Sequence, residues 1–262
     1  MAESRPGATA RFFALAFLFT WCLQIPAVLA QRGWLPGPAE GYLPLAMLGV
    51  LGPLAAATVL TARAGGRPAV RALFGSLRRW RAPWWCYAAA LVVPGALLSL
   101  GLGALSLVGY EGDVVLAPDA ARWLAIPVIA IGEEVGWRGY ALPRLRRRYG
   151  AFAASVMLGA IWTVWHVPMF LGVGVPMSTL PVMLLFFAGG SLWFTWIQAR
   201  AGGSLLLVVL AHVGAHLNNA HATLPGDTLP LLVGAVVYAG LGVAVVYFDR
   251  KTFPLGSPKR SR

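Results

Sequence analysis

The sequence predicts an all-α polytopic membrane protein, a bundle of about eight transmembrane helices around a polar intramembrane cavity. Of its 262 residues, 58% are hydrophobic and 11% are charged, and the mean hydropathy is +0.71, which no ordinary soluble domain reaches. The cavity is predicted by Glu133, Glu134 and Arg138, which lie in the middle of an otherwise apolar stretch. Ionised groups at mid-bilayer cost roughly 2.5–3.5 kcal/mol each, so they must face protein or water and find partners.

Eight segments are apolar and long enough to cross a bilayer, which takes about 20 helical residues. They are 12–30, 43–62, 84–108, 123–143, 151–172, 179–199, 204–224 and 229–248. Turn residues and charges bracket nearly all of them, and no internal repeat is visible. We therefore treat 1–262 as a single transmembrane domain.

Two segments have alternatives. The first ends in Val28-Leu29-Ala30, which resembles a signal-peptidase site, although Thr20 and Pro26 interrupt the apolar run and favour a retained span. The basic segment 66–81 has apolar residues at helical spacing, which predicts an amphipathic helix on the inner surface rather than a solvated loop.

The basic residues predict the orientation. With the N-terminus inside, eighteen lysines and arginines fall on the inner side and only Arg32 and Arg122 on the outer side, as the positive-inside rule requires. We expect a multi-pass protein of the inner membrane of a bacterial cell, with both termini cytoplasmic. The net charge of +12 is spread over short clusters between spans, so no nucleic-acid partner is expected. The expected partners are lipids and a substrate, and the oligomeric state stays open.

Three histidines join the charged residues at membrane depth: His166 in the fifth segment and His212 and His216 in the seventh. At about 1.5 Å per residue, Glu133 lies about 16 Å from either surface, and His166 and His212 lie about 22 and 13 Å from the inner ends of their segments. The three spans can therefore bring these groups to one level.

Helical spacing then assigns faces. His212 and His216 are four residues apart and share a face, as do Glu134 and Arg138, which we expect to form an ion pair. Glu133 is turned about 100° from Glu134. This predicts a structural pair, Glu134–Arg138, and a separate Glu133 that points to the cavity with the histidines.

A carboxylate, two or three imidazoles and a water form a hydrolytic set, in which the carboxylate is the general base and imidazoles hold water or an oxyanion. Zinc or another divalent cation is compatible with it. Two other classes of function use similar residues: an ion- or proton-coupled transporter, which the missing repeat disfavours, and a non-catalytic membrane scaffold.

Three parts of the sequence resemble the motifs of the CPBP family. They are Glu133-Glu134-Val-Gly-Trp-Arg138, Trp162-x-x-Trp165-His166, and His212 nine residues after Gly203. The members of this family are CAAX-protease and bacteriocin-processing intramembrane proteases, also called the Abi family. The resemblance is dense over 129–219, the expected catalytic core.

This resemblance implies an eight-helix endopeptidase that cleaves a membrane-associated protein or peptide. It implies that Glu133 activates water, that His166 and His212 position the water and stabilise the oxyanion, and that Arg138 holds the motif helix. The family usually has Asn or Asp where this chain has His216. A third imidazole allows a metal on His166, His212 and His216, although we favour the mechanism without metal. The substrate's identity is left open.

Overall fold

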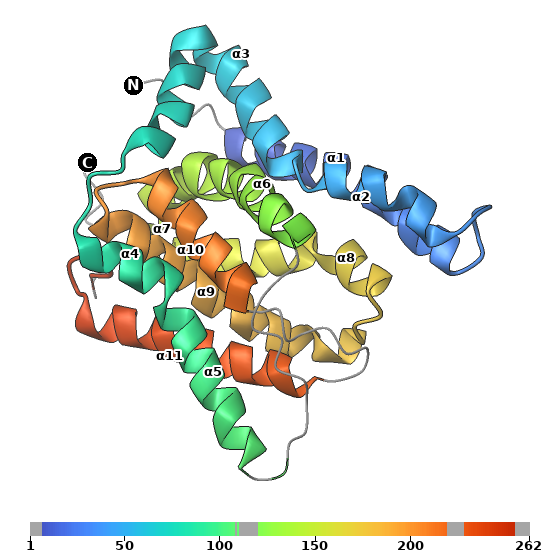
Figure 1. Cartoon of the computed structure of the whole chain (residues 1–262). Helices are drawn as coiled ribbons and strands as arrows, with labels where there is room; N and C mark the ends of the chain where they lie inside the picture. The colour runs from blue at the N-terminus through green and yellow to red at the C-terminus, as the bar shows by residue number, and fades with distance from the viewer. Residues whose placement is uncertain (1–6, 108, 110–119, 219–227, 255–262) are drawn as a thin grey trace.

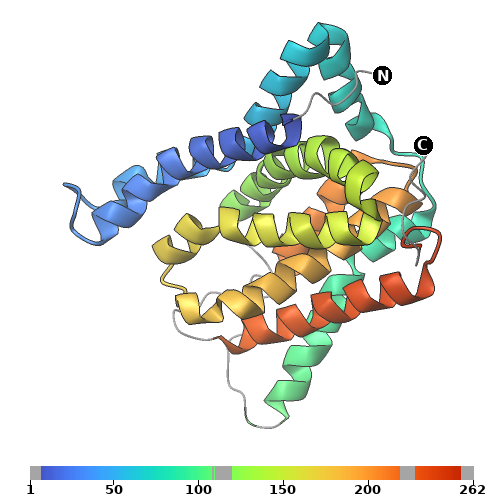
Figure 2. The same cartoon turned by 180° about the vertical axis from the view of Figure 1, so that it is seen from behind.

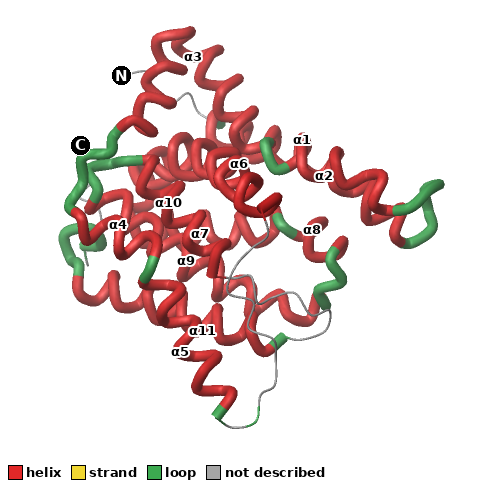
Figure 3. Tube along the Cα trace, in the orientation of Figure 1, coloured by secondary structure: helices red, strands yellow, loops and turns green. Residues whose placement is uncertain are grey.

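All regular elements in the part of the chain that the computed structural model describes, residues 7–107, 109, 120–218 and 228–254, are helices (Figures 1 and 3). The predicted fold class, an all-α membrane bundle, is thus confirmed. The α-helices are α1 (Ala8–Gln31), α2 (Leu43–Gly49), α3 (Gly52–Gly75), α4 (Trp84–Leu91), α5 (Val93–Ser106), α6 (Ala120–Gly136), α7 (Leu142–Trp165), α8 (Val167–Gly172), α9 (Leu180–Arg200), α10 (Leu205–Asn218) and α11 (Leu229–Phe248). Short helical turns are η1 (Ala39–Tyr42), η2 (Ser76–Arg78), η3 (Trp137–Ala141) and η4 (Met177–Thr179).

Prolines divide three of the predicted spans into two helices each. Pro53 begins α3 after α2, Pro94 begins α5 after α4, and Pro168 begins α8 after α7. Proline has no N–H and its ring clashes with the preceding turn, so it ends one helix and is accepted in the first turn of the next. Hydropathy alone does not show these breaks.

Two glycines reverse the chain inside long helices. Gly66 has φ 62° in α3 and Gly150 has φ 78° in α7, a left-handed conformation that residues with a Cβ rarely adopt. The second limb of α3 is helical with Val70, Leu73 and Phe74 half-buried, as expected of the amphipathic segment. Its contact with a membrane surface stays a prediction.

Six stretches of the described chain are long and apolar enough to cross a membrane. The stretch Trp123–Gly172 holds the fourth and fifth predicted spans, and the seventh corresponds to the shorter apolar helix Leu205–His216. The end of that predicted span, from residue 219, lies outside the described residues. Within the described residues, each of the eight predicted segments overlaps helical structure, and that all eight cross a membrane stays a prediction.

The most enclosed helices carry the polar residues. In the spanning windows of Trp123–Gly172 and Met177–Arg200, 56% of the residues are buried, against 28% in Ala8–Gln31. The first helix is nevertheless part of the bundle, because Phe12 and Ala16 on it are fully buried. Figures 1 and 2 show that α1 begins and α11 ends on the same side of the bundle, as expected when a chain crosses a bilayer an even number of times.

Candidate active site

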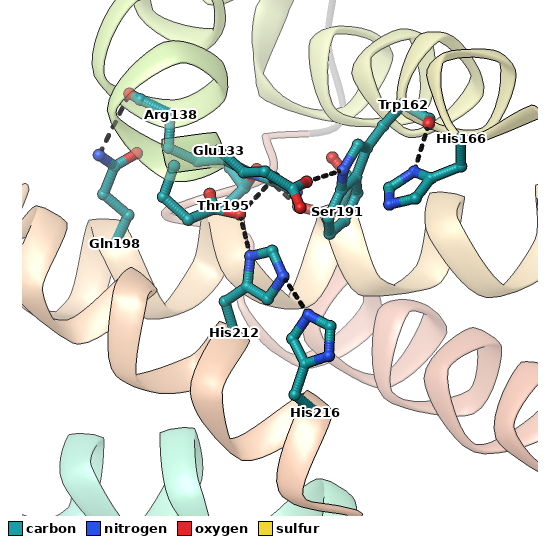
Figure 4. Close-up of polar contacts among 10 residues, drawn as sticks. Glu133, Arg138, Trp162, His166, Ser191, Thr195, Gln198, His212 and His216 are labelled. Carbon is teal, nitrogen blue, oxygen red and sulfur yellow. Dashed lines mark hydrogen bonds and ion pairs between the residues drawn. The ribbon is translucent and has the colours of Figure 1, made fainter. Parts of the chain in front are cut away.

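The six predicted site residues come from three places in the bundle, and Figure 4 labels five of them, Glu133, Arg138, His166, His212 and His216. Glu134 contacts two of these five, Arg138 and His212. Glu133 and Glu134 end α6, Arg138 lies in η3, His166 joins α7 to α8, and His212 and His216 lie on α10. Five of the six are buried, with at most 8% of the residue exposed, and His216 is half-buried. This gathering of ionisable groups in an apolar bundle is the defining feature of the molecule.

The first part of the site is an ion pair on a distorted helix. Arg138 Nη1 lies 2.9 Å from Glu134 Oε1, with both side chains fully buried, so the predicted pair is confirmed. Arg138 belongs to a π-helical turn, Trp137–Ala141. Such turns are rare and are often found at functional sites. The sequence carries no signal that we could have used to predict this turn.

Aromatic faces complete the surroundings of Arg138. Its guanidinium lies 4.4 Å from the ring centre of Trp162 and 5.0 Å from that of Phe194. Within the described chain, its Nε and Nη2 have no hydrogen-bond partner. Cation–π attraction is strongest away from water, so these rings offset part of the cost of burying the cation.

Glu134 has a second partner that the sequence did not predict. His212 Nδ1 lies 2.7 Å from Glu134 Oε1, the same oxygen that accepts from Arg138. The predicted division, with Glu134 purely structural and His212 beside Glu133, therefore needs correction. Glu134 links the motif helix to α10, because helix geometry turns it toward both Arg138 and the facing helix.

Glu133 is held by a tryptophan. Trp162 Nε1 donates to Glu133 Oε2 at 2.5 Å, and only 2% of Glu133 is exposed. This hydrogen bond fixes one carboxylate oxygen and orients the other. The sequence analysis gave Trp162 no role beyond its place in the motif Trp162-x-x-Trp165-His166, although its position four residues before His166, on the same helix face, could have indicated a shared role.

His166 lies in an aromatic box at the end of α7. Its Nδ1 is 2.8 Å from the carbonyl oxygen of Trp162, and its ring stacks on Phe170 with an interplanar angle of 15°. Because a carbonyl oxygen only accepts, Nδ1 carries the hydrogen and the neutral ring presents Nε2 as an acceptor. Trp165, against the other edge of the ring, is pinned to α1 by a 2.9 Å hydrogen bond to Thr20.

The start of α10 is fixed by a cap. Ser204 Oγ accepts from the backbone N–H of Leu207 at 3.2 Å and donates to the carbonyl oxygen of Arg79 at 2.6 Å. A serine before the first helical turn satisfies an amide that has no partner within the helix. The cap and the Arg79 contact set where α10 starts, and thereby the depth of His212 and His216.

The donor geometry does not assemble the predicted three-histidine metal site. The Nδ1 atoms of His166 and His212 are engaged by Trp162 and Glu134, as is usual for metal-ligating histidines, so an ion would have to bind their Nε2 atoms. His212 Nε2 lies 3.0 Å from His216 Nε2, at hydrogen-bond distance. Among the residues described, no group of three or more His, Cys, Asp or Glu side chains is arranged to hold one ion. The mechanism without metal stays a prediction.

Comparisons with known proteins match the same part of the chain. Residues 119–218 match the family model described as type II CAAX prenyl endopeptidase Rce1-like, and this range contains all six site residues. A CAAX prenyl protease 2 from Methanococcus maripaludis is 26% identical over 182 residues, which cover 63% of this chain and 64% of that protein. The similarity therefore spans less than two thirds of the length of that relative.

Proposed function

This chain belongs to the CPBP family of CAAX-type proteases, and from that premise we propose that it is an intramembrane endopeptidase. It hydrolyses a peptide bond in a membrane-associated protein or peptide. The observation that carries the proposal is Glu133, a carboxylate 2% exposed that is held by Trp162 beside buried imidazoles. Among the described residues the side-chain hydrogen-bond partner of Glu133 is the neutral Trp162, while Arg138 is paired with Glu134, and a buried acid of this kind is suited to proton transfer.

The mechanism uses Glu133 Oε1 and His166 Nε2, because the described residues engage the other oxygen and the other nitrogen of these side chains. Glu133 removes a proton from a water molecule while the water oxygen attacks the carbonyl carbon of the substrate. The His166 Nε2 lone pair accepts a hydrogen bond from the other O–H of that water, because its Nδ1 already donates to Trp162. Glu133 then returns its proton to the peptide nitrogen as the carbon–nitrogen bond breaks, which leaves a carboxylic acid and an amine, and the acid gives its proton to solvent when it is released.

The ion pair Glu134–Arg138 holds the helix that carries Glu133. Both side chains are fully buried, so the pair holds the motif helix in one geometry and keeps the cation near Glu133 compensated. We further propose that both termini are cytoplasmic, as the distribution of basic residues and the common side of the start of α1 and the end of α11 support.

The test uses two quenched fluorescent peptides that end in a CAAX sequence, one prenylated at the cysteine and one not. The purified chain is reconstituted in nanodiscs, and products are identified by mass spectrometry. We expect cleavage at one internal peptide bond, and the pair of peptides tells whether a lipid anchor is required. If the reconstituted, folded chain cleaves neither peptide, the proposal is contradicted.

A further inference from the structure

Three side chains form a continuous hydrogen-bonded row that leads outward from the ion pair. Glu134 Oε1 is 2.7 Å from His212 Nδ1, and His212 Nε2 is 3.0 Å from His216 Nε2. The two imidazole rings are nearly parallel, at 5°, with centres 4.9 Å apart. Figure 4 shows His212 between the motif helix and His216.

The direction of this row is fixed by its inner end. The Glu134 carboxylate, paired with Arg138, accepts hydrogen bonds, so the hydrogen lies on His212 Nδ1. A neutral imidazole has one N–H, and His212 Nε2 is therefore an acceptor. The 3.0 Å contact then requires that His216 Nε2 donates. Every hydrogen in the row points toward Glu134.

The fixed orientation of the His212 ring also affects the orientation of Glu133. The His212 ring packs edge-to-face on Trp162, with centres 5.5 Å apart at 69°. Trp162 in turn holds Glu133 Oε2 through its indole N–H. A ring fixed at both nitrogens keeps Trp162, and thereby the carboxylate, in one orientation.

We propose that His216 is a positioning residue for Glu133, acting through His212 and Trp162. This deepens the proposed function and rests on it for its effect on cleavage, while the hydrogen-bonded row stands on geometry alone. In this structure both ring nitrogens of His212 are engaged, one by Glu134 and the other by His216.

The hydrogen-bonded row is tested without any substrate, by ¹⁵N solid-state NMR. The full chain carries the label only at histidine and has no histidine tag, and it is measured in nanodiscs at mildly alkaline pH. The sequence has four histidines, so variants His212→Gln, His216→Gln and His221→Gln assign the signals. We expect His212 protonated at Nδ1 and His216 protonated at Nε2. Two results would overturn the proposal. One is a hydrogen on His212 Nε2, and the other is a His216 Nε2 that carries no hydrogen, as would be found if His212 Nε2 and His216 Nε2 bound one metal ion.

The effect on catalysis is tested with a matched pair of substitutions. His216→Gln keeps an N–H donor near the position of Nε2, whereas His216→Leu removes the donor at similar volume. We expect His216→Leu to lower kcat about tenfold or more with KM within about twofold, and His216→Gln to stay within about threefold of wild type. Equal loss in both variants, with folding retained in thermal melts, would overturn the positioning role. If wild type cleaves neither CAAX peptide, the proposed function fails, and the NMR result alone decides the row.

Discussion

The indole nitrogen of Trp162 lies 2.5 Å from Glu133 Oε2, and this contact joins residues 29 positions apart on two different helices. It gives the buried carboxylate a neutral donor where the neighbouring Glu134 has a cation and an imidazole. Two adjacent glutamates thus receive different surroundings. Glu134 is compensated by charge, and Glu133 is oriented by a neutral donor.

Replacing Trp162 tests this contact. Trp162→Phe keeps an aromatic ring over Arg138 and removes the N–H donor to Glu133. We expect kcat for peptide cleavage to fall by a factor of about 10 to 100, since a hydrogen bond to a charged group contributes about 1.5–3 kcal/mol. The control is Trp193→Phe, because Trp193 is buried and its Nε1 has no partner in the described chain. Equal activity in the two variants would show that the indole N–H is not needed.

Breaking the buried ion pair should reduce stability as well as activity. Removing one partner of a buried pair leaves an uncompensated charge and costs about 3–5 kcal/mol, so Arg138→Ala should lower the yield of folded protein and its melting temperature in detergent. The control is Arg147→Ala, which removes an exposed arginine. An exposed charge of this kind contributes at most about 1 kcal/mol. A folded, fully active Arg138→Ala variant is the result that contradicts this interpretation.

A glycine sets the distance between α6 and α3. A Cβ on Gly136 would lie 2.4 Å from Pro53 Cβ and 2.6 Å from its backbone carbonyl carbon, closer than any real contact. We expect Gly136→Ala to destabilise the protein by about 1–3 kcal/mol through overpacking and to disturb the motif helix. Gly240→Ala is the control, because nothing lies within 4 Å of its added Cβ. Similar melting curves for the two variants would contradict the packing.

Asp249, just beyond the last span, makes a pH-dependent contribution to the stability of the fold. Burial acts to raise the pKa of its carboxyl, but hydrogen bonds from Arg200 and Thr252 outweigh burial and lower the pKa below its ordinary value. Ionised Asp249 therefore stabilises the fold at pH above the ordinary range of a carboxyl, and this stability is lost as pH falls through the lowered pKa.

Thermal melts across pH check this sign. Asp249→Asn should be less stable than wild type at neutral pH, and the difference should shrink as the solution becomes acidic. Trp196 and Thr252 also donate to Asp249 Oδ2, each at 2.9 Å, so the asparagine variant keeps part of the network and should fold. A difference that grows in acid would contradict the lowered pKa.

Much of the fold could be predicted because bilayer thickness and basic residues constrain it strongly. The last span, 229–248, was placed at the observed ends of α11, and the pair Glu134–Arg138 followed from i,i+4 spacing. The breaks at Val92 and His166 could have been predicted from the prolines two residues later. Apolar composition hides them, because both halves remain lipid-compatible.

The site was harder to predict, because its contacts depend on how helices face one another. Spacing showed that His212 and His216 share a face, but not that His212 turns toward Glu134 rather than Glu133. The π-helical turn at Trp137–Ala141 shifts the register after the glutamates, and helical periodicity cannot anticipate it. Trp162 was noticed, but a tryptophan between apolar neighbours is usually core.

The most direct test of Glu133 as the water-activating base is the cleavage rate of Glu133→Gln beside that of wild type. The amide keeps the shape and can still accept from Trp162, but it cannot take a proton, so cleavage should fall by a factor of about 100 or more while the melting temperature changes little. Glu40→Gln, which alters an exposed carboxylate in η1, should cleave as wild type does. Cleavage by Glu133→Gln at the wild-type rate would contradict the assignment of Glu133 as the base.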